Sequence, residues 1–421
     1  MILPMLSVLF FFLSSPLTRL DFITSSSTTL SIGSFFGNGQ IAPPAPLSPR
    51  TLGSTDITVS PLALGTQRWV SSDFNAPDQA TCFDLLDTAY DAGVRTIDTA
   101  EQYPIPSDSS NPEGATETTI GNWLKARPNI DRKSMTIVSK ITGSTNVSKN
   151  NIEKDLDGTL RRLQTSYLDV YLLHWPQRYS PQSNWGQSLK YNANMEYKRA
   201  ISFEELVATM DKMVKKGKIR GWGLCNDSAY GLTKASVIAK ANNLNAPCTF
   251  QGDFSLLDRK SEENGVLETC SLYNEDIGFM AYNVLAGGIL TGKYGSKKSG
   301  GGARGRFDDR GWGGTLYRYR SGPALEAVAQ YSKLAKDENM ELGELAIRWA
   351  LEREGVDTLL LGHSNVDQLK EQIGWAKKGK LGDGVGWEID RVHMRNRNPI
   401  FANDDVPKEW AGTGLIGEQI P

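Results

Sequence analysis

The sequence predicts a single (β/α)8 barrel with extra loops and a C-terminal extension. Short apolar segments alternate with helical patterns between residues 50 and 381, and such alternation indicates parallel strands joined by right-handed crossovers. Eight strand–helix units within roughly 330 residues favour a closed barrel over an open sheet. The main alternative is an open dinucleotide-binding sheet, but no Gly-x-Gly-x-x-Gly motif follows the first apolar segment.

The predicted strands are runs of aliphatic, β-branched and aromatic residues, which suit packed positions in a sheet. They cover residues 62–65, 94–98, 134–140, 167–173, 219–224, 248–251, 278–282 and 358–361. Helical patterns fall between and after them, at about 78–90, 117–125, 152–163, 202–213, 230–241, 262–274, 324–337 and 342–353, and from residue 365 onward.

Amphipathic spacing and capping residues support the individual helices. The segment 152–163 places Ile152, Leu156, Leu160 and Leu163 on one face, as expected for a helix that packs on a sheet. Ser202 and Glu205 form a capping-box pattern that predicts the start of the next helix.

Residues 1–48 differ in composition from the rest of the chain. An apolar run, MLSVLFFFL, begins at Met5 and is too short to span a bilayer, and a tract rich in Ser, Thr and Pro follows it. The segment is expected to be a targeting leader, either a plastid transit peptide or an endomembrane signal. A disordered extension of a cytoplasmic protein is the alternative.

Charge and composition exclude several functional classes. A formal net charge of −2 and a charged content of 22% describe a soluble globular protein without the field that attracts nucleic acid or acidic lipid. The four cysteines and three histidines are widely spaced and form no Cys-x-x-Cys or His-Glu-x-x-His motif. We therefore expect buried free thiols, no metal site, and no membrane association of the mature protein.

Two stretches fall outside the repeat. Residues 295–322 are rich in Gly, Arg and Tyr, and long loops of this kind in compact domains are usually functional or disordered. Residues 382–421 form the extension, which is expected to cover one opening of the barrel.

Polar residues gather where the predicted strands end. Asp98 ends the second strand and Tyr103 lies on its loop, Lys140 ends the third strand, and His174 follows the fourth. In a barrel these positions meet at the C-terminal face, where the chemistry of such folds lies.

These four residue types suit the delivery of a proton. A tyrosine with a reference pKa of about 10 is a weak acid at neutral pH, and a nearby ammonium, itself held by a carboxylate, lowers that pKa. A histidine can orient the substrate oxygen. The set therefore predicts reduction of a carbonyl, with Tyr103 as the proton donor and a cofactor as the source of hydride.

The motifs around these residues resemble those of the aldo-keto reductases. The resemblance rests on Asp-Thr-Ala-Glu-x-Tyr at 98–103, on Ser139-Lys140 and on Leu-Leu-His-Trp-Pro at 172–176, and it continues through residues 221–226, 251–257, 285–294 and 361–372. It extends over roughly residues 50–395. Within the family, the run 101–106 is most similar to the bacterial Tas-type subgroup, which itself resembles potassium-channel β subunits.

The resemblance implies a role for each matching residue. Asp98, Tyr103, Lys140 and His174 would be catalytic, and NADP(H) would be the cofactor. Its nicotinamide would contact Asn226, Gln251 and Phe254. The pyrophosphate would lie along Leu285, Gly287 and Lys293. The adenosine end would be held by Gly362, Ser364, Gln368 and Gln372. The activity implied is NADPH-dependent reduction of an aldehyde or ketone, and a redox-sensing regulatory subunit with little turnover is the alternative.

Overall fold

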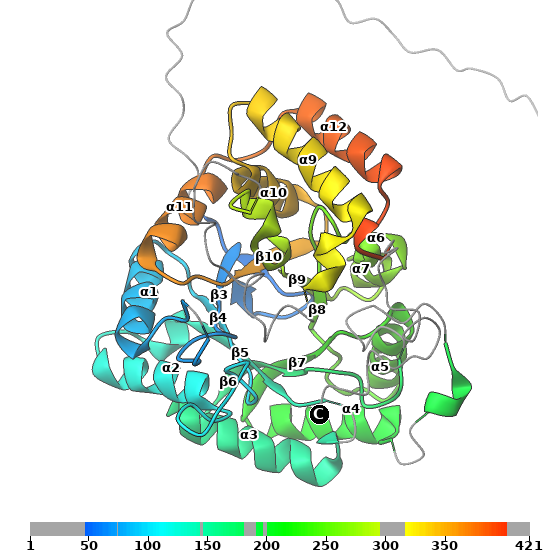
Figure 1. Cartoon of the computed structure of the whole chain (residues 1–421). Helices are drawn as coiled ribbons and strands as arrows, with labels where there is room; N and C mark the ends of the chain where they lie inside the picture. Colours follow the sequence, from blue (N-terminus) through cyan, green and yellow to red (C-terminus); the bar gives the residue numbers. More distant parts are fainter. Residues whose placement is uncertain are drawn as a thin grey trace, which may run out of the picture. The chain divides into compact units, whose positions relative to one another are not determined.

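A computed structural model describes residues 47–73, 75–143, 146–180, 191–196, 200–294 and 316–401. The predicted leader up to residue 46, most of the loop 295–322 and the end of the chain lie outside these ranges. The described residues form the predicted closed barrel of eight parallel strands, in the order β10-β3-β4-β5-β6-β7-β8-β9 (Figure 1).

All eight predicted strands are confirmed. They are β3 (Leu62–Gly65), β4 (Thr96–Asp98), β5 (Thr136–Ile141), β6 (Leu168–Leu173), β7 (Ile219–Cys225), β8 (Thr249–Asp253), β9 (Gly278–Tyr282) and β10 (Val356–Leu361). Asp98 is the last residue of its strand and lies level with Gly65 on β3 and Val138 on β5. The register therefore brings the polar strand ends to one face of the barrel.

Helices surround the barrel, and the longer ones are α1 (Gln79–Asp91), α2 (Ala115–Ala126), α3 (Lys149–Leu163), α4 (Phe203–Lys215), α5 (Ala229–Ala241), α9 (Gly322–Asp337), α10 (Leu342–Glu352), α11 (Val366–Ala376) and α12 (Asp383–Arg395). Shorter elements connect them: η1 (Arg132–Ser134), η4 (Ala193–Met195), α6 (Lys260–Glu263), α7 (Val266–Cys270), η5 (Ala286–Thr291), η6 (Tyr317–Arg320) and η7 (Pro399–Phe401).

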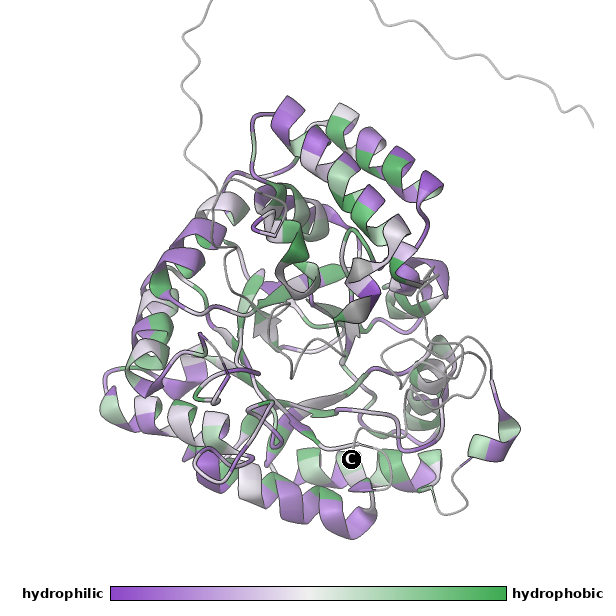
Figure 2. Ribbon diagram, in the orientation of Figure 1, coloured by the Kyte–Doolittle hydropathy of each residue, from purple (hydrophilic) through white to green (hydrophobic). Residues whose placement is uncertain are grey.

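The predicted caps and apolar faces position these helices. The Ser202 hydroxyl accepts a hydrogen bond from the Glu205 N–H at the start of α4. On α3, Ile152, Leu156 and Leu163 are fully buried. Hydrophobic and hydrophilic residues fall on different faces of the surrounding helices (Figure 2), so the apolar layer between strands and helices forms the main core.

The single helix predicted at 262–274 is wrong, because the chain breaks it into α6 and α7. The break falls at Asn264 and Gly265, where Gly265 adopts a left-handed φ of 83° and the Asn264 side chain accepts a hydrogen bond from the Val266 N–H. An Asn-Gly pair favours such a turn over a continuous helix.

A hairpin that the sequence analysis did not predict covers the N-terminal end of the barrel. Its strands β1 (Arg50–Thr51) and β2 (Thr58–Val59) are antiparallel. Leu52, Ile57 and Val59 are buried and pack with residues of the barrel interior and with Cys248, just before β8. Side chains of the hairpin therefore fill the floor of the barrel, opposite the polar strand ends.

The C-terminal extension is described as far as residue 401. Its helix α12 packs against α9. The Asp390 carboxylate of α12 also forms an ion pair, at 2.6 Å, with the guanidinium of Arg259, which lies just before α6. The described part of the extension therefore belongs to the outer helical layer. No helix among the described residues has the length and apolarity needed to cross a membrane. All four cysteines are buried and free, as predicted.

Candidate active site

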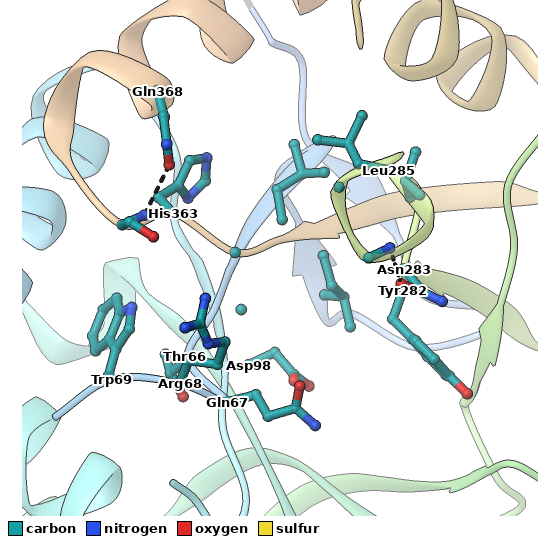
Figure 3. A pocket seen from close by; sticks show the side chains of 18 of the residues that line it. Thr66, Gln67, Arg68, Trp69, Asp98, Tyr282, Asn283, Leu285, His363 and Gln368 are labelled. Carbon is teal, nitrogen blue, oxygen red and sulfur yellow. Dashed lines mark hydrogen bonds between the residues drawn. The ribbon is translucent and has the colours of Figure 1, made fainter. Parts of the chain in front are cut away.

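A cavity of about 880 Å³ opens at the C-terminal ends of the strands. Figure 3 shows it with His363 and Gln368 on one side and Tyr282, Asn283 and Leu285 on the other. Of the predicted site residues, Lys140 and Phe254 do not line this cavity. The other twelve do: Asp98, Tyr103, His174, Asn226, Gln251, Leu285, Gly287, Lys293, Gly362, Ser364, Gln368 and Gln372. The strand ends therefore bring together nearly all of the residues predicted from separate motifs.

Lys140 lies buried beneath the cavity and is held by two oxygen atoms. Its Nζ donates to Asp98 Oδ1 at 2.7 Å and to the carbonyl oxygen of Thr99 at 2.7 Å. The second oxygen of the carboxylate, Asp98 Oδ2, accepts a hydrogen bond from Gln251 Nε2 at 2.7 Å. These hydrogen bonds hold the buried ammonium at the end of β4, next to the loop that carries Tyr103.

Tyr103 and His174 lie above this ammonium. Lys140 Nζ is 5.0 Å from the centre of the Tyr103 ring. The rings of Tyr103 and His174 meet edge to face, with centroids 5.6 Å apart. The Tyr103 N–H donates to the Ala100 carbonyl oxygen at 3.1 Å, and the Gly114 N–H donates to the Tyr103 carbonyl oxygen at 2.9 Å. The predicted tetrad is thus assembled from three strand ends and one turn.

Burial controls the charges of this group. It raises the pKa of Asp98, and the Lys140 ammonium opposes that change. Burial, followed by the nearby Lys140 ammonium, holds the pKa of His174 well below its usual range. His174 is therefore neutral at physiological pH. Its Nδ1 atom is buried without a hydrogen-bond partner among the described residues.

Asn226, Gln251 and Tyr282 surround the catalytic end of the cavity. The Asn226 side chain donates to the His174 carbonyl oxygen at 2.9 Å and accepts from the Tyr282 hydroxyl at 2.6 Å. The Cys225 thiol donates to the Gln251 side-chain oxygen at 3.6 Å. Each amide is oriented by neighbours, and both line the cavity as predicted.

Phe254 does not lie at the cavity, so this part of the prediction is wrong. Its ring stacks on Trp349 of α10 at 5.2 Å and meets Phe279 edge to face, in the core between barrel and helices. Tyr282, whose hydroxyl donates to Asn226, does line the cavity. Strand parity could have indicated this, because Gln251 points inward and a residue three positions later points outward.

The predicted pyrophosphate segment follows β9. Gly287 and Gly288 have positive φ values of 66° and 99°, and the Asn283 side chain accepts a hydrogen bond from the Gly287 N–H at 2.9 Å. A Cβ atom on Gly287 would lie 2.8 Å from the Leu316 side chain. Glycine is therefore required both for the backbone conformation and for the close approach of Leu316.

The predicted adenosine segment joins β10 to α11. The Gln368 side-chain oxygen accepts a hydrogen bond from the Ser364 N–H at 2.9 Å (Figure 3). His363 lies 3.0 Å from the Gln372 oxygen, and its burial lowers its pKa to about 4. This end of the cavity thus presents neutral polar groups together with the side chain of Glu371.

The loop after β3 is a part of the site that the sequence analysis missed. Thr66, Gln67, Arg68 and Trp69 all line the cavity, and Arg68 is paired with Asp73 at 2.7 Å. The position of the loop at the end of the first barrel strand was the available signal. Among the described residues, no group of three or more His, Cys, Asp or Glu side chains could hold a metal ion.

Comparison with known proteins agrees with this geometry. The chain is 33% identical over 351 residues to Protein tas of Escherichia coli (strain K12), covering 81% of this chain and 96% of that protein, and it matches Protein tas of Shigella flexneri equally well. It is 34% identical over 267 residues to an aldo-keto reductase of Babesia bovis, covering 62% of this chain and 92% of the relative. The aldo/keto reductase family model matches residues 61–392, from the first barrel strand into α12. The chain therefore belongs to the aldo/keto reductase family, and within it resembles the Tas proteins.

Proposed function

We propose that the protein reduces an aldehyde or ketone to an alcohol with NADPH, and that Tyr103 is the general acid. One observation carries the proposal: the buried Lys140 ammonium, bound to Asp98 at 2.7 Å, lies 5.0 Å from the centre of the Tyr103 ring at the cavity. Members of the family are oxidoreductases that act on small-molecule carbonyls, so the general class of reaction follows from the family.

The cavity has the size and chemistry for a nicotinamide dinucleotide. Its volume of about 880 Å³ lies within the range of small-molecule sites, which is roughly 300–1,000 Å³. The glycine turn at Gly287 and Gly288 lets a ligand approach the backbone closely, and Lys293 beside it can neutralise phosphate oxygens. Ser364, Gln368 and Gln372 would hold the adenosine end.

A bound nicotinamide ring would supply the hydride. Tyr103 would then give its proton to the carbonyl oxygen, and the Lys140 ammonium would stabilise the negative charge left on the phenol oxygen. Asp98 would keep that ammonium in place. Neutral His174 can donate a hydrogen bond to the same carbonyl oxygen and orient it. Asn226 and Gln251 would hold the ring through its amide.

The proposal is tested by fluorescence titration with NADPH and NADH, followed by steady-state assays with a panel of aldehydes and ketones. We expect tighter binding of NADPH and turnover of at least one carbonyl. The Tyr103→Phe variant should bind NADPH normally while kcat falls about 100-fold or more. Unchanged turnover in that variant would exclude Tyr103 as the acid, and absence of turnover in the parent protein would favour the regulatory alternative.

A further inference from the structure

The loop that carries Tyr103 is attached to β5 beyond the end of the regular strand pairing. The Thr99 N–H donates to the Val138 carbonyl oxygen at 2.9 Å, and the Glu101 N–H donates to the Lys140 carbonyl oxygen at 3.2 Å. Together with the bond from Lys140 Nζ to the Thr99 carbonyl oxygen, these contacts make β5 the support of the loop.

The side chain of Glu101 adds a further attachment at the same place. Its Oε1 atom accepts a hydrogen bond from the Thr142 N–H at 2.6 Å. Glu101 therefore holds the end of β5 on both sides of Ile141, through its own N–H on one side and through its carboxylate on the other. Tyr103 follows two residues later, so movement of Glu101 would move Tyr103.

We propose that Glu101 is a positioning residue for Tyr103, and that the charge on its carboxyl group controls how firmly the loop is held against β5. The inference rests on the proposed function and concerns its regulation. A carboxylate accepts a stronger hydrogen bond from an N–H than a neutral carboxyl group does. The loop is thus held more firmly when Glu101 is ionised.

The surroundings of Glu101 disfavour its ionised form. Burial is the largest cause and raises the pKa of Glu101 to about 7 against the opposing hydrogen bond from Thr142, and the carboxylates of Asp155 on α3 and Glu117 on α2 also act to raise it. Two cations on neighbouring elements are already paired with other carboxylates. Arg162 Nε of α3 donates to Glu117 Oε2 at 2.6 Å, and Lys140 Nζ donates to Asp98 Oδ1.

The remaining titratable neighbours add no positive charge. Burial, and then the charges of Glu101, Glu117 and Asp155, raise the pKa of Tyr171 on β6, so this residue stays neutral. Its buried hydroxyl has no hydrogen-bond partner among the described residues. His174 is neutral. The charge on Glu101 therefore changes within the physiological range, and kcat should rise as pH increases through about 7.

Three variants test the inference in the full-length protein. Glu101→Gln keeps an oxygen acceptor for the Thr142 N–H but cannot ionise, so its kcat should match the low-pH value of the parent protein and show no step near the pH of about 7 at which Glu101 titrates. Glu101→Ala removes the acceptor as well as the charge, so its kcat should lie about tenfold below the high-pH value of the parent protein at every pH and show no step, with NADPH affinity unchanged. Glu113→Gln, at an exposed position, is the matched control and should keep the parent profile.

Two measurements do not depend on turnover and so separate this inference from the proposed function. Infrared difference spectra should show a carboxyl group that titrates near a pH of about 7 in the parent protein and is missing from Glu101→Gln. Hydrogen exchange should show faster exchange of the Thr142 amide in Glu101→Ala. A parent pH profile retained in Glu101→Gln, or unchanged exchange at Thr142, would overturn the inference even if carbonyl reduction is confirmed.

Discussion

The Lys140 ammonium and the Asp98 carboxylate are 2.7 Å apart, and both side chains are almost completely removed from solvent. A buried pair of this kind is costly to break, since the remaining charge is left uncompensated. Loss of one partner typically destabilises a protein by about 3–5 kcal/mol, whereas replacing both by apolar residues can be neutral.

The first prediction follows from this pair. Lys140→Met should lose both turnover and about 3–5 kcal/mol of unfolding free energy, measured by chemical denaturation. The double variant Lys140→Met with Asp98→Leu should recover most of the stability and none of the turnover. Recovery of turnover in the double variant would contradict the assigned role of Lys140.

A second prediction contrasts Tyr282 with Phe254. Tyr282 lines the cavity and bonds Asn226, whereas Phe254 packs on Trp349 in the outer core. Tyr282→Leu should weaken NADPH binding about tenfold, from lost ring contact and a lost hydrogen bond. Phe254→Leu should lower stability by roughly 1–3 kcal/mol and leave NADPH affinity unchanged. If fluorescence titrations instead showed weaker NADPH binding in Phe254→Leu and unchanged binding in Tyr282→Leu, Phe254 would be the aromatic residue that contacts the cofactor.

The third prediction concerns stability and pH at Asp357. Burial raises the pKa of Asp357 to about 6, against the opposing effects of the Phe279 N–H and Arg50. Between about pH 4 and 6 the folded state retains the proton that the unfolded state loses, so this contribution to stability is lost as pH rises through 6.

Asp357→Asn, which keeps an acceptor for the Phe279 N–H, should remove this dependence. The variant should be more stable than the parent protein at about pH 7.5, by at most about 3 kcal/mol, and should lose this advantage at about pH 4. Denaturation curves at the two pH values give the comparison, and a difference independent of pH would argue against the raised pKa.

A fourth prediction tests the hairpin below the barrel. Leu52 is fully buried against the barrel floor. Leu52→Ala should therefore lower the free energy of unfolding by about 2–5 kcal/mol, with kcat unchanged because the cavity lies at the other end of the strands. Thr51→Ala, at an exposed position on the same hairpin, is the matched control and should have little effect on stability. Equal losses in the two variants would argue against a plug formed by Leu52.

The fifth prediction concerns residues 1–48, which we propose to be a targeting leader. Fusion of this segment to a fluorescent protein should direct it to a plastid or to the endomembrane system of a cell that contains both. A diffuse cytoplasmic signal would instead support an untargeted extension.

The barrel could be predicted because each strand is a short, mostly apolar run, and several of these runs end at a polar residue. Asp98, Lys140 and His174 stand out in the sequence for this reason, and parallel pairing necessarily brings their strand ends together. The β1–β2 hairpin could not be found in this way, because each of its strands has two residues and no periodicity can be read from so short a run.

Two features of the candidate site, the place of Phe254 and the contact of Glu101, could not be predicted from the sequence. Phe254 was assigned through a motif, whereas the structure places it just after β8 with its ring packed on Trp349. Glu101 was visible as part of the same motif as Tyr103, but its role depends on the Thr142 N–H, which lies just beyond the end of β5. Contacts that depend on three-dimensional register cannot be derived from one segment alone.

The hairpin also sets a boundary for maturation. The Arg50 guanidinium donates to the carbonyl oxygens of Val356 and Leu351, and Leu52 seals the barrel floor from below. If the proposed leader is removed, we expect the cut to fall before Arg50, because a later cut would lose the two hydrogen bonds that join the hairpin to Val356 and Leu351. Packing at the end of the barrel farthest from the cavity would thereby decide how much of the N-terminal segment can be removed without loss of the fold.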